Sequence, residues 1–140
     1  MYRMSRSIPS ALQPTSWLLH LRAFATLMRV HRTLRHCRYD ELRQFLATRQ
    51  RQGPAAHNAI EIARVMAAIE RVCLWYVPRS RCLHRSAVLV SLLRSVGVDA
   101  VMVMGIRVEP YAGHAWVEVN GVVVNDDDAF VKSYIPVDRV

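Results

Sequence analysis

The spacing of apolar residues changes at Gly97, and this change constrains the fold more than any other feature of the sequence. Before Gly97, apolar residues recur at the spacing of amphipathic helices. After Gly97, apolar and polar residues alternate, as they do in strands that have one buried face. A run of helices followed by a run of strands predicts an α+β fold, in which N-terminal helices pack on a small antiparallel sheet.

Four helices are predicted before Gly97, after an irregular lead-in at residues 1–15. They are expected over residues 17–34, from Asp40 to about residue 50, over residues 55–72, and from about residue 80 to residue 96. Asp40 is a suitable N-cap, Gly53-Pro54 ends the second helix, and Gly97 fits the position after the last helix. Three helices have an apolar stripe: Trp17, Leu21, Phe24 and Met28; Ile62, Met66, Ile69 and Cys73; Leu89, Leu92, Leu93 and Val96.

After Gly97 the pattern predicts a strand over residues 99–108, the turn EPYAG and a β-hairpin over residues 113–128. The hairpin turns at Asn120-Gly121, and two registers fit it. A two-residue loop pairs Val119 with Val122, gives the cleaner apolar face and places His114 on the face of Asp127. A three-residue loop that includes Val119 pairs Glu118 with Val122 and sets His114 opposite Asp126.

The composition describes a globular chain in a reducing compartment. A length of 140 residues predicts a single domain, and 52% apolar residues exclude a disordered chain. No apolar run approaches the ~18 residues of a membrane span, and the N-terminus does not read as a signal peptide. The three cysteines fit no disulfide framework. We therefore expect a cytoplasmic protein that has no membrane association.

The charge of the chain is divided unevenly. Residues 1–97 carry 16 arginines and 4 acidic residues, a net of +12, whereas residues 98–140 carry 3 basic and 7 acidic residues, a net of −4. A basic half could attract an acidic peptide, an acidic protein or nucleic acid. Solvated helix faces explain the same charge equally well. The chain shows no helix-turn-helix or aromatic stacking signature, so nucleic acid is not the expected partner.

Cys82 is the candidate nucleophile. It lies in the first turn of the fourth predicted helix, where unpaired N–H groups and nearby arginines stabilise a thiolate. A thiol enzyme also needs a base and a group that orients the base, and His114 followed by an aspartate could supply them. The plain alternative is a buried, inert cysteine, which is also how we interpret Cys73.

Residues 81 to about 128 resemble the core of the transglutaminase-like leader peptidases of lasso peptide biosynthesis. The shared features are a cysteine at the start of a Leu-rich helix that ends R-x-x-G, a strand reading GIR, the motif GHAWVE-x-x-G, and an aspartate about twelve residues after the histidine. This resemblance implies a transglutaminase-like, papain-like cysteine protease core. It also implies Cys82 as nucleophile, His114 as general base and then acid, and Asp126 as the orienting carboxylate.

The resemblance also implies a reaction and its partners. The enzyme would remove the leader from a ribosomally made lasso precursor peptide in a bacterial cytoplasm, without a cofactor or a metal. Residues 76–140 would form the catalytic core, and residues 1–75 a basic helical part. Because 140 residues leave no room for a leader-recognition domain, the chain resembles the split type of the family. It would then work with a separate recognition protein and with the lasso cyclase.

Three other functions were weighed. A different acyl transfer, such as amide formation, could use the same triad, because pocket shape chooses the acceptor. A non-enzymatic basic binding module would need neither Cys82 nor His114. A zinc site could draw on Cys73, Cys82, His84 and His114, although these residues lack the short Cys-x-x-Cys pairs of structural zinc sites.

Overall fold

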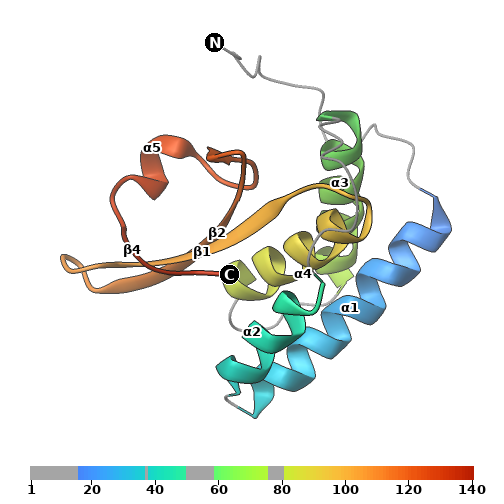
Figure 1. Cartoon of the computed structure of the whole chain (residues 1–140), viewed down its shortest axis with the longest axis horizontal. Helices are drawn as coiled ribbons and strands as arrows, with labels where there is room; N and C mark the ends of the chain where they lie inside the picture. Colours follow the sequence, from blue (N-terminus) through green and yellow to red (C-terminus); the bar gives the residue numbers. More distant parts are fainter. Residues whose placement is uncertain (1–15, 37, 50–58, 76–80) are drawn as a thin grey trace.

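A computed structural model of the chain describes residues 16–36, 38–49, 59–75 and 81–140 (Figure 1). These residues form an α+β fold, which confirms the predicted fold class. The elements, in chain order, are α1 (Trp17–Arg35), α2 (Tyr39–Ala47), α3 (Ala59–Trp75), α4 (Arg81–Ser95), β1 (Ala100–Arg107), β2 (Ala112–Val119), β3 (Val122–Val123), α5 (Asp128–Val131) and β4 (Ile135–Arg139). None of the helices in these ranges has the length and apolar character needed to cross a membrane.

Helix α4 lies at the centre of the fold. It packs against α1 and α3 on one side and against β1 and β2 on the other, and every residue from 86 to 93 is buried. Gly97 ends the helix as predicted, in the left-handed conformation (φ 86°). The N–H of Val98 donates to the carbonyl of Leu93 over 2.9 Å, and the N–H of Gly97 to that of Arg94 over 3.1 Å. These two backbone hydrogen bonds together form a Schellman motif.

The helix bounds agree with the prediction more closely than the buried faces do. Helix α1 buries Ala23, Thr26, Leu27 and Val30, whereas the side chains of Trp17, Leu21 and Phe24 are exposed by 69%, 54% and 47%. The predicted stripe therefore located the helix without identifying its packed face. Small and branched residues line the packed face instead, because α1 lies directly against α3 and α4.

Helix α2 differs from the prediction at its start. Arg38, rather than Asp40, is the N-cap residue, and no side chain caps the helix. Asp40 lies in the first turn, where a carboxylate still interacts favourably with the helix dipole. The predicted stop at Gly53-Pro54 and the predicted start of the third helix at residue 55 lie outside the described residues.

The sheet has the strand order β3-β2-β1-β4, and all its pairs are antiparallel. Val119 pairs with Val122 around a two-residue loop, in which Asn120 (φ 52°) and Gly121 (φ 75°) both adopt positive φ. This is the first of the two predicted registers, and the three-residue loop is wrong. Sequence patterns did not reveal β4 or α5, and the predicted turn EPYAG already enters β2 at Ala112.

The two faces of the sheet contact different parts of the chain. Ala100, Met102, Val117 and Val119 belong to the main core, which they form with the four long helices. Val103 and Trp116 alternate with them and pack instead against Val131 and Tyr134, in and just after α5. His114 lies on the Trp116 face, because side chains two residues apart on a strand point the same way. The second, smaller core therefore lies beside His114.

Gly105 keeps this second core in place. It pairs with His114, and a Cβ atom added to it would lie 2.8 Å from two ring carbons of Trp116 and 3.0 Å from Cβ of Tyr134. We predict that Gly105→Ala lowers the free energy of unfolding by about 1–3 kcal/mol, the usual cost of overpacking a core. Denaturant unfolding measures the loss.

Gly113→Ala is the matched control, because a Cβ atom on Gly113 would meet nothing within 4 Å. Its unfolding free energy should stay within about 1 kcal/mol of the original, as is usual for Gly→Ala at an unstrained position. Equal stability of the two variants would contradict the tight approach of Trp116 to Gly105.

Candidate active site

His114 and Asp126 form a partly buried pair. Nε2 of His114 lies 2.5 Å from Oδ2 of Asp126, and the two side chains are only 15% and 26% exposed. The other carboxylate oxygen of Asp126 accepts the backbone N–H of Asp127 over 2.9 Å. Both oxygens of Asp126 are therefore engaged, and the carboxylate is held in one orientation beside the imidazole.

Asp127 has a different task. It is the N-cap of α5, and its Oδ1 accepts the N–H groups of Ala129 and Phe130 over 2.8 and 3.2 Å. In a regular hairpin of this register Asp127 would share the face of His114. The hairpin is not regular so far from its loop, because β3 ends at Val123 and the chain then bends. The histidine therefore meets Asp126 in spite of the two-residue loop.

The side chain of Asn125 makes two hydrogen bonds at this bend. Its Oδ1 accepts the N–H of Val117 over 2.8 Å, and its Nδ2 donates to Oγ of Ser86 over 3.1 Å. Ser86 is fully buried on α4 and donates to the carbonyl of Ala115 over 3.0 Å. Ala115 directly follows His114, so these bonds join α4, β2 and the segment that carries Asp126.

Cys82 lies in the first turn of α4, as predicted, and is a half-buried free thiol. Residues four apart share a face of a helix, so Cys82 lies one turn before Ser86 on the side that contacts β2. Among the described residues, the hydrogen bonds of the site join His114 to Asp126 but do not include the Cys82 thiol. The structure thus brings two of the three candidate residues into contact and places the third on the adjoining helix.

The remaining sulfur and imidazole candidates lie elsewhere. Cys73 packs against the main core from α3, and its burial raises the pKa of its thiol. His84 is 5% exposed, and its Nε2 lies 3.4 Å from Nδ1 of His31. In the described part of the chain no three His, Cys, Asp or Glu side chains converge as metal ligands. The zinc-site alternative therefore gains no support from the geometry.

Aromatic rings surround His114. The ring centroids of Phe130 and Tyr134 lie 5.3 and 5.2 Å from that of the imidazole, with Phe130 edge-on, and Trp116 stacks at 6.2 Å. Trp116 is 1% exposed, so it fills the second core and also covers one side of the histidine. Sequence reasoning missed Phe130 and Tyr134. Their spacing of four residues after the aspartate run was the available signal.

The indole of Trp116 is itself held by a charged group. Its Nε1–H donates to Oε1 of Glu118 over 2.9 Å, and Oε2 of Glu118 lies 2.7 Å from Nη1 of Arg139. Burial alone would raise the pKa of Glu118, but the hydrogen bonds from Trp116 and Arg139 hold it below its ordinary value. Glu118 is therefore ionised at neutral pH and keeps the indole in place.

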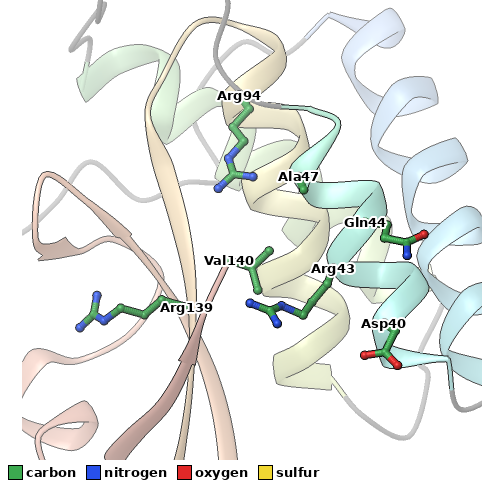
Figure 2. A pocket seen from close by; sticks show the side chains of 7 residues that line it. All are labelled: Asp40, Arg43, Gln44, Ala47, Arg94, Arg139 and Val140. Carbon is green, nitrogen blue, oxygen red and sulfur yellow. The ribbon is translucent and has the colours of Figure 1, made fainter.

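A separate hollow of about 680 Å³ lies between α2 and the end of β4 (Figure 2). Its lining is Asp40, Arg43, Gln44, Ala47, Arg94, Arg139 and Val140. Figure 2 shows the side chains of Arg43 and Arg94 entering the space beside Val140. Arg94 donates to the carbonyls of Leu46 and Ala100, and the nearby carboxylate of Asp99 favours its charged form. Arg43 pairs with Asp138 and Arg139 with Glu118, and the hollow includes neither Cys82 nor His114.

Comparison with known proteins gives one partial relative. Over 48 residues the chain is 46% identical to the microcin J25-processing protein McjB of Escherichia coli. That stretch is 34% of this chain and 23% of McjB, so the chain spans less than a quarter of the relative it matches. No solved structure matches the chain.

A family comparison covers far more of the molecule. The model of the transglutaminase-like superfamily matches residues 18–138, which include the His114–Asp126 pair and all the helices and strands except the first residue of α1 and the last residue of β4. Since this match extends over much more than half of the sequence, the chain belongs to the transglutaminase-like superfamily.

Proposed function

We propose that this protein is a cysteine peptidase that removes the leader from a lasso precursor peptide, with Cys82, His114 and Asp126 as its triad. The observation that carries the proposal is the His114–Asp126 pair, whose histidine lies on the strand next to the helix that has Cys82 in its first turn. The partial likeness to McjB, whose name states that it processes microcin J25, supports a precursor peptide as the substrate.

The contact between His114 and Asp126 supports a different role for each ring nitrogen of His114. An ionised carboxylate only accepts hydrogen bonds, so Asp126 selects the tautomer that carries its proton on Nε2. Nδ1 is then the free base of the ring. In the proposed reaction Nδ1 takes the proton of the Cys82 thiol, and the ion pair of imidazolium and Asp126 stabilises the charge that forms.

The remaining steps follow from the thiolate. Sγ of Cys82 attacks the scissile carbonyl, and the oxyanion accepts a hydrogen bond from the Cys82 N–H at the open end of α4. His114 then gives its proton to the leaving amine as the C–N bond breaks, which leaves the leader as a thioester on Cys82. Water, deprotonated by the same imidazole, hydrolyses the thioester and restores the thiol.

An amine could replace water as the acceptor of the acyl group. The superfamily match supports acyl transfer as the reaction type, and an amine in place of water would give amide formation from the same thioester. The choice between the two depends on what reaches the thioester, not on the triad. Peptidase activity is our primary proposal, because McjB is named for processing a peptide.

The helical part would serve partners rather than chemistry. We propose that residues 76–140 form the catalytic core and that the basic residues 1–75 dock a separate leader-recognition protein or an acidic leader, with the cyclase acting next. Arg32 and Arg35 are exposed in the last turn of α1, and the sequence of that helix contains no acidic residue. A cytoplasmic location would keep Cys82 reduced.

The first prediction concerns Cys82 itself. A lasso precursor incubated with this protein and its recognition partner should be cut at the end of the leader, and Cys82→Ala should abolish the cut, because the proposed thioester forms on the Cys82 sulfur. Mass spectrometry of the precursor reads the result.

Cys73→Ala is the control, since Cys73 packs in the core and should be dispensable for chemistry. Cleavage by Cys82→Ala, or an uncut precursor with the wild type and its partner present, would defeat the peptidase proposal.

The second prediction separates the two aspartates. Asp126→Asn should lower kcat by about 10²–10⁴-fold, because an amide no longer stabilises the imidazolium or selects its tautomer. Asp127→Asn should leave kcat and stability nearly unchanged, because Asn caps a helix about as well as Asp does. Steady-state kinetics on the precursor compare them. A larger loss from Asp127→Asn would show that the wrong carboxylate had been assigned.

The third prediction concerns docking. Reversal of Arg32, Arg35 and Arg38 to glutamate should weaken binding to the recognition partner, and the difference should shrink as salt rises. Arg38 should contribute least, because it already pairs with Glu41. Titration calorimetry at two salt concentrations measures the effect. Lys132→Glu, a single charge reversal outside the helical part, is the control for each single arginine variant, and equal losses would contradict docking on these helices.

A further inference from the structure

We infer that Asn125 and Ser86 are positioning residues for the triad: their hydrogen bonds select Asp126 as the partner of His114 and fix the Cys82 turn of α4 against β2. The inference rests on the proposed function for its catalytic consequence. Its structural basis is a set of three hydrogen bonds at the point where the hairpin stops.

The first step concerns the ladder between β2 and the chain after β3. Around a two-residue loop, hydrogen-bonded pairs recur every second residue, so Val117 and Val124 should exchange two backbone bonds. One of them is present, from the N–H of Val124 to the carbonyl of Val117 over 3.0 Å. The N–H of Val117 instead donates to Oδ1 of Asn125. The side chain of Asn125 has therefore replaced a backbone carbonyl.

The second step is the consequence for the aspartates. With its side chain in the ladder, Asn125 ends strand pairing, and the backbone turns away from β2 immediately before Asp126. Asp126 then reaches Nε2 of His114, while Asp127 is left to begin α5. Continued pairing would have carried Asp127 toward the histidine. The side chain at 125 thus decides which carboxylate completes the pair.

The third step explains why residue 125 is an asparagine. The Ser86 hydroxyl has one proton, which it donates to the carbonyl of Ala115, so it can only accept from residue 125. Residue 125 must therefore donate to Ser86 and at the same time accept from Val117. A side-chain amide meets both demands. An ionised aspartate, such as its three neighbours in the sequence, has no proton to donate.

The fourth step connects the set to Cys82. Ser86 lies one helical turn after Cys82, and Ala115 lies one residue after His114. The Ser86–Ala115 bond thus ties the turn that holds the nucleophile to the strand that holds the base. Its loss should change the relative placement of the two groups without removing any reacting atom. We therefore expect an effect on kcat rather than on KM.

The test compares Ser86→Ala, Asn125→Ala and the double variant with Ser91→Ala. Ser91 is the matched control, because it is equally buried on α4 and its hydroxyl accepts from Arg49 on the side away from the hairpin. The first two variants should each lower kcat by about 10–100-fold with little change in KM, as small misplacements of catalytic groups do. The double variant should be no worse than the poorer single variant, because the residues act as one unit.

Ser91→Ala should lose comparable stability in denaturant unfolding but keep its kcat. Three results would overturn the inference: an equal fall in kcat for Ser91→Ala, additive losses in the double variant, or losses that only follow the folded fraction.

A measurement without substrate separates this inference from the proposed function. In ¹⁵N-labelled protein the Nε2–H of His114 should give a low-field proton resonance because it donates to Asp126. The resonance should disappear in Asn125→Ala and persist in Ser91→Ala. Persistence in Asn125→Ala would refute the positioning role whatever the enzyme cleaves. An uncut precursor with the predicted resonances intact would instead refute the peptidase proposal alone.

Discussion

The burial of α4 on all sides is the constraint on which the rest of the structure depends. Residues 86–93 have no exposed face, because α1 and α3 cover one side and β1 and β2 the other. A helix enclosed in this way cannot shift along its axis without opening several contacts at once, since protein interiors are close-packed. The position of the helix along its axis, and with it that of the first turn and Cys82, is therefore set by the core. Any chemistry that uses Cys82 gains a rigid platform from that packing.

Much of this fold could be predicted because period is a local property of sequence. The change at Gly97 separated helices from strands, and Asn120-Gly121 marked the hairpin loop that the structure contains. The buried face of α1 could not be predicted in this way, because α1 carries two apolar stripes and only its neighbours select one. Strand β4 was not predicted, for a related reason. Ile135 and Val137 are exposed on an edge strand with Pro136, so no alternation marks a buried face.

The candidate site shows the same boundary between local and tertiary information. Asn120-Gly121 left two registers open, and the two-residue loop, which gives the cleaner apolar face, pointed to Asp127 as the partner of His114. His114 contacts Asp126, the aspartate that the family resemblance implied. The loop has two residues, however, and not the three that regular pairing of His114 with Asp126 would require. The register of a hairpin does not determine where the pairing of its two strands ends. That point depends on Asn125, whose partner Ser86 lies 39 residues earlier in the chain.

The hydrogen bonds of Ser86 and Asn125 constrain orientation in a way that apolar packing does not. Buried amide and hydroxyl groups destabilise a fold unless each finds a partner, and Ser86 and Asn125 do so only in one mutual arrangement. Apolar contacts are not directional and tolerate small shifts, whereas a hydrogen bond weakens steeply with angle. Orientation of an imidazole to within a fraction of an ångström requires directional bonds, and here they lie one residue from His114 and one residue from Asp126.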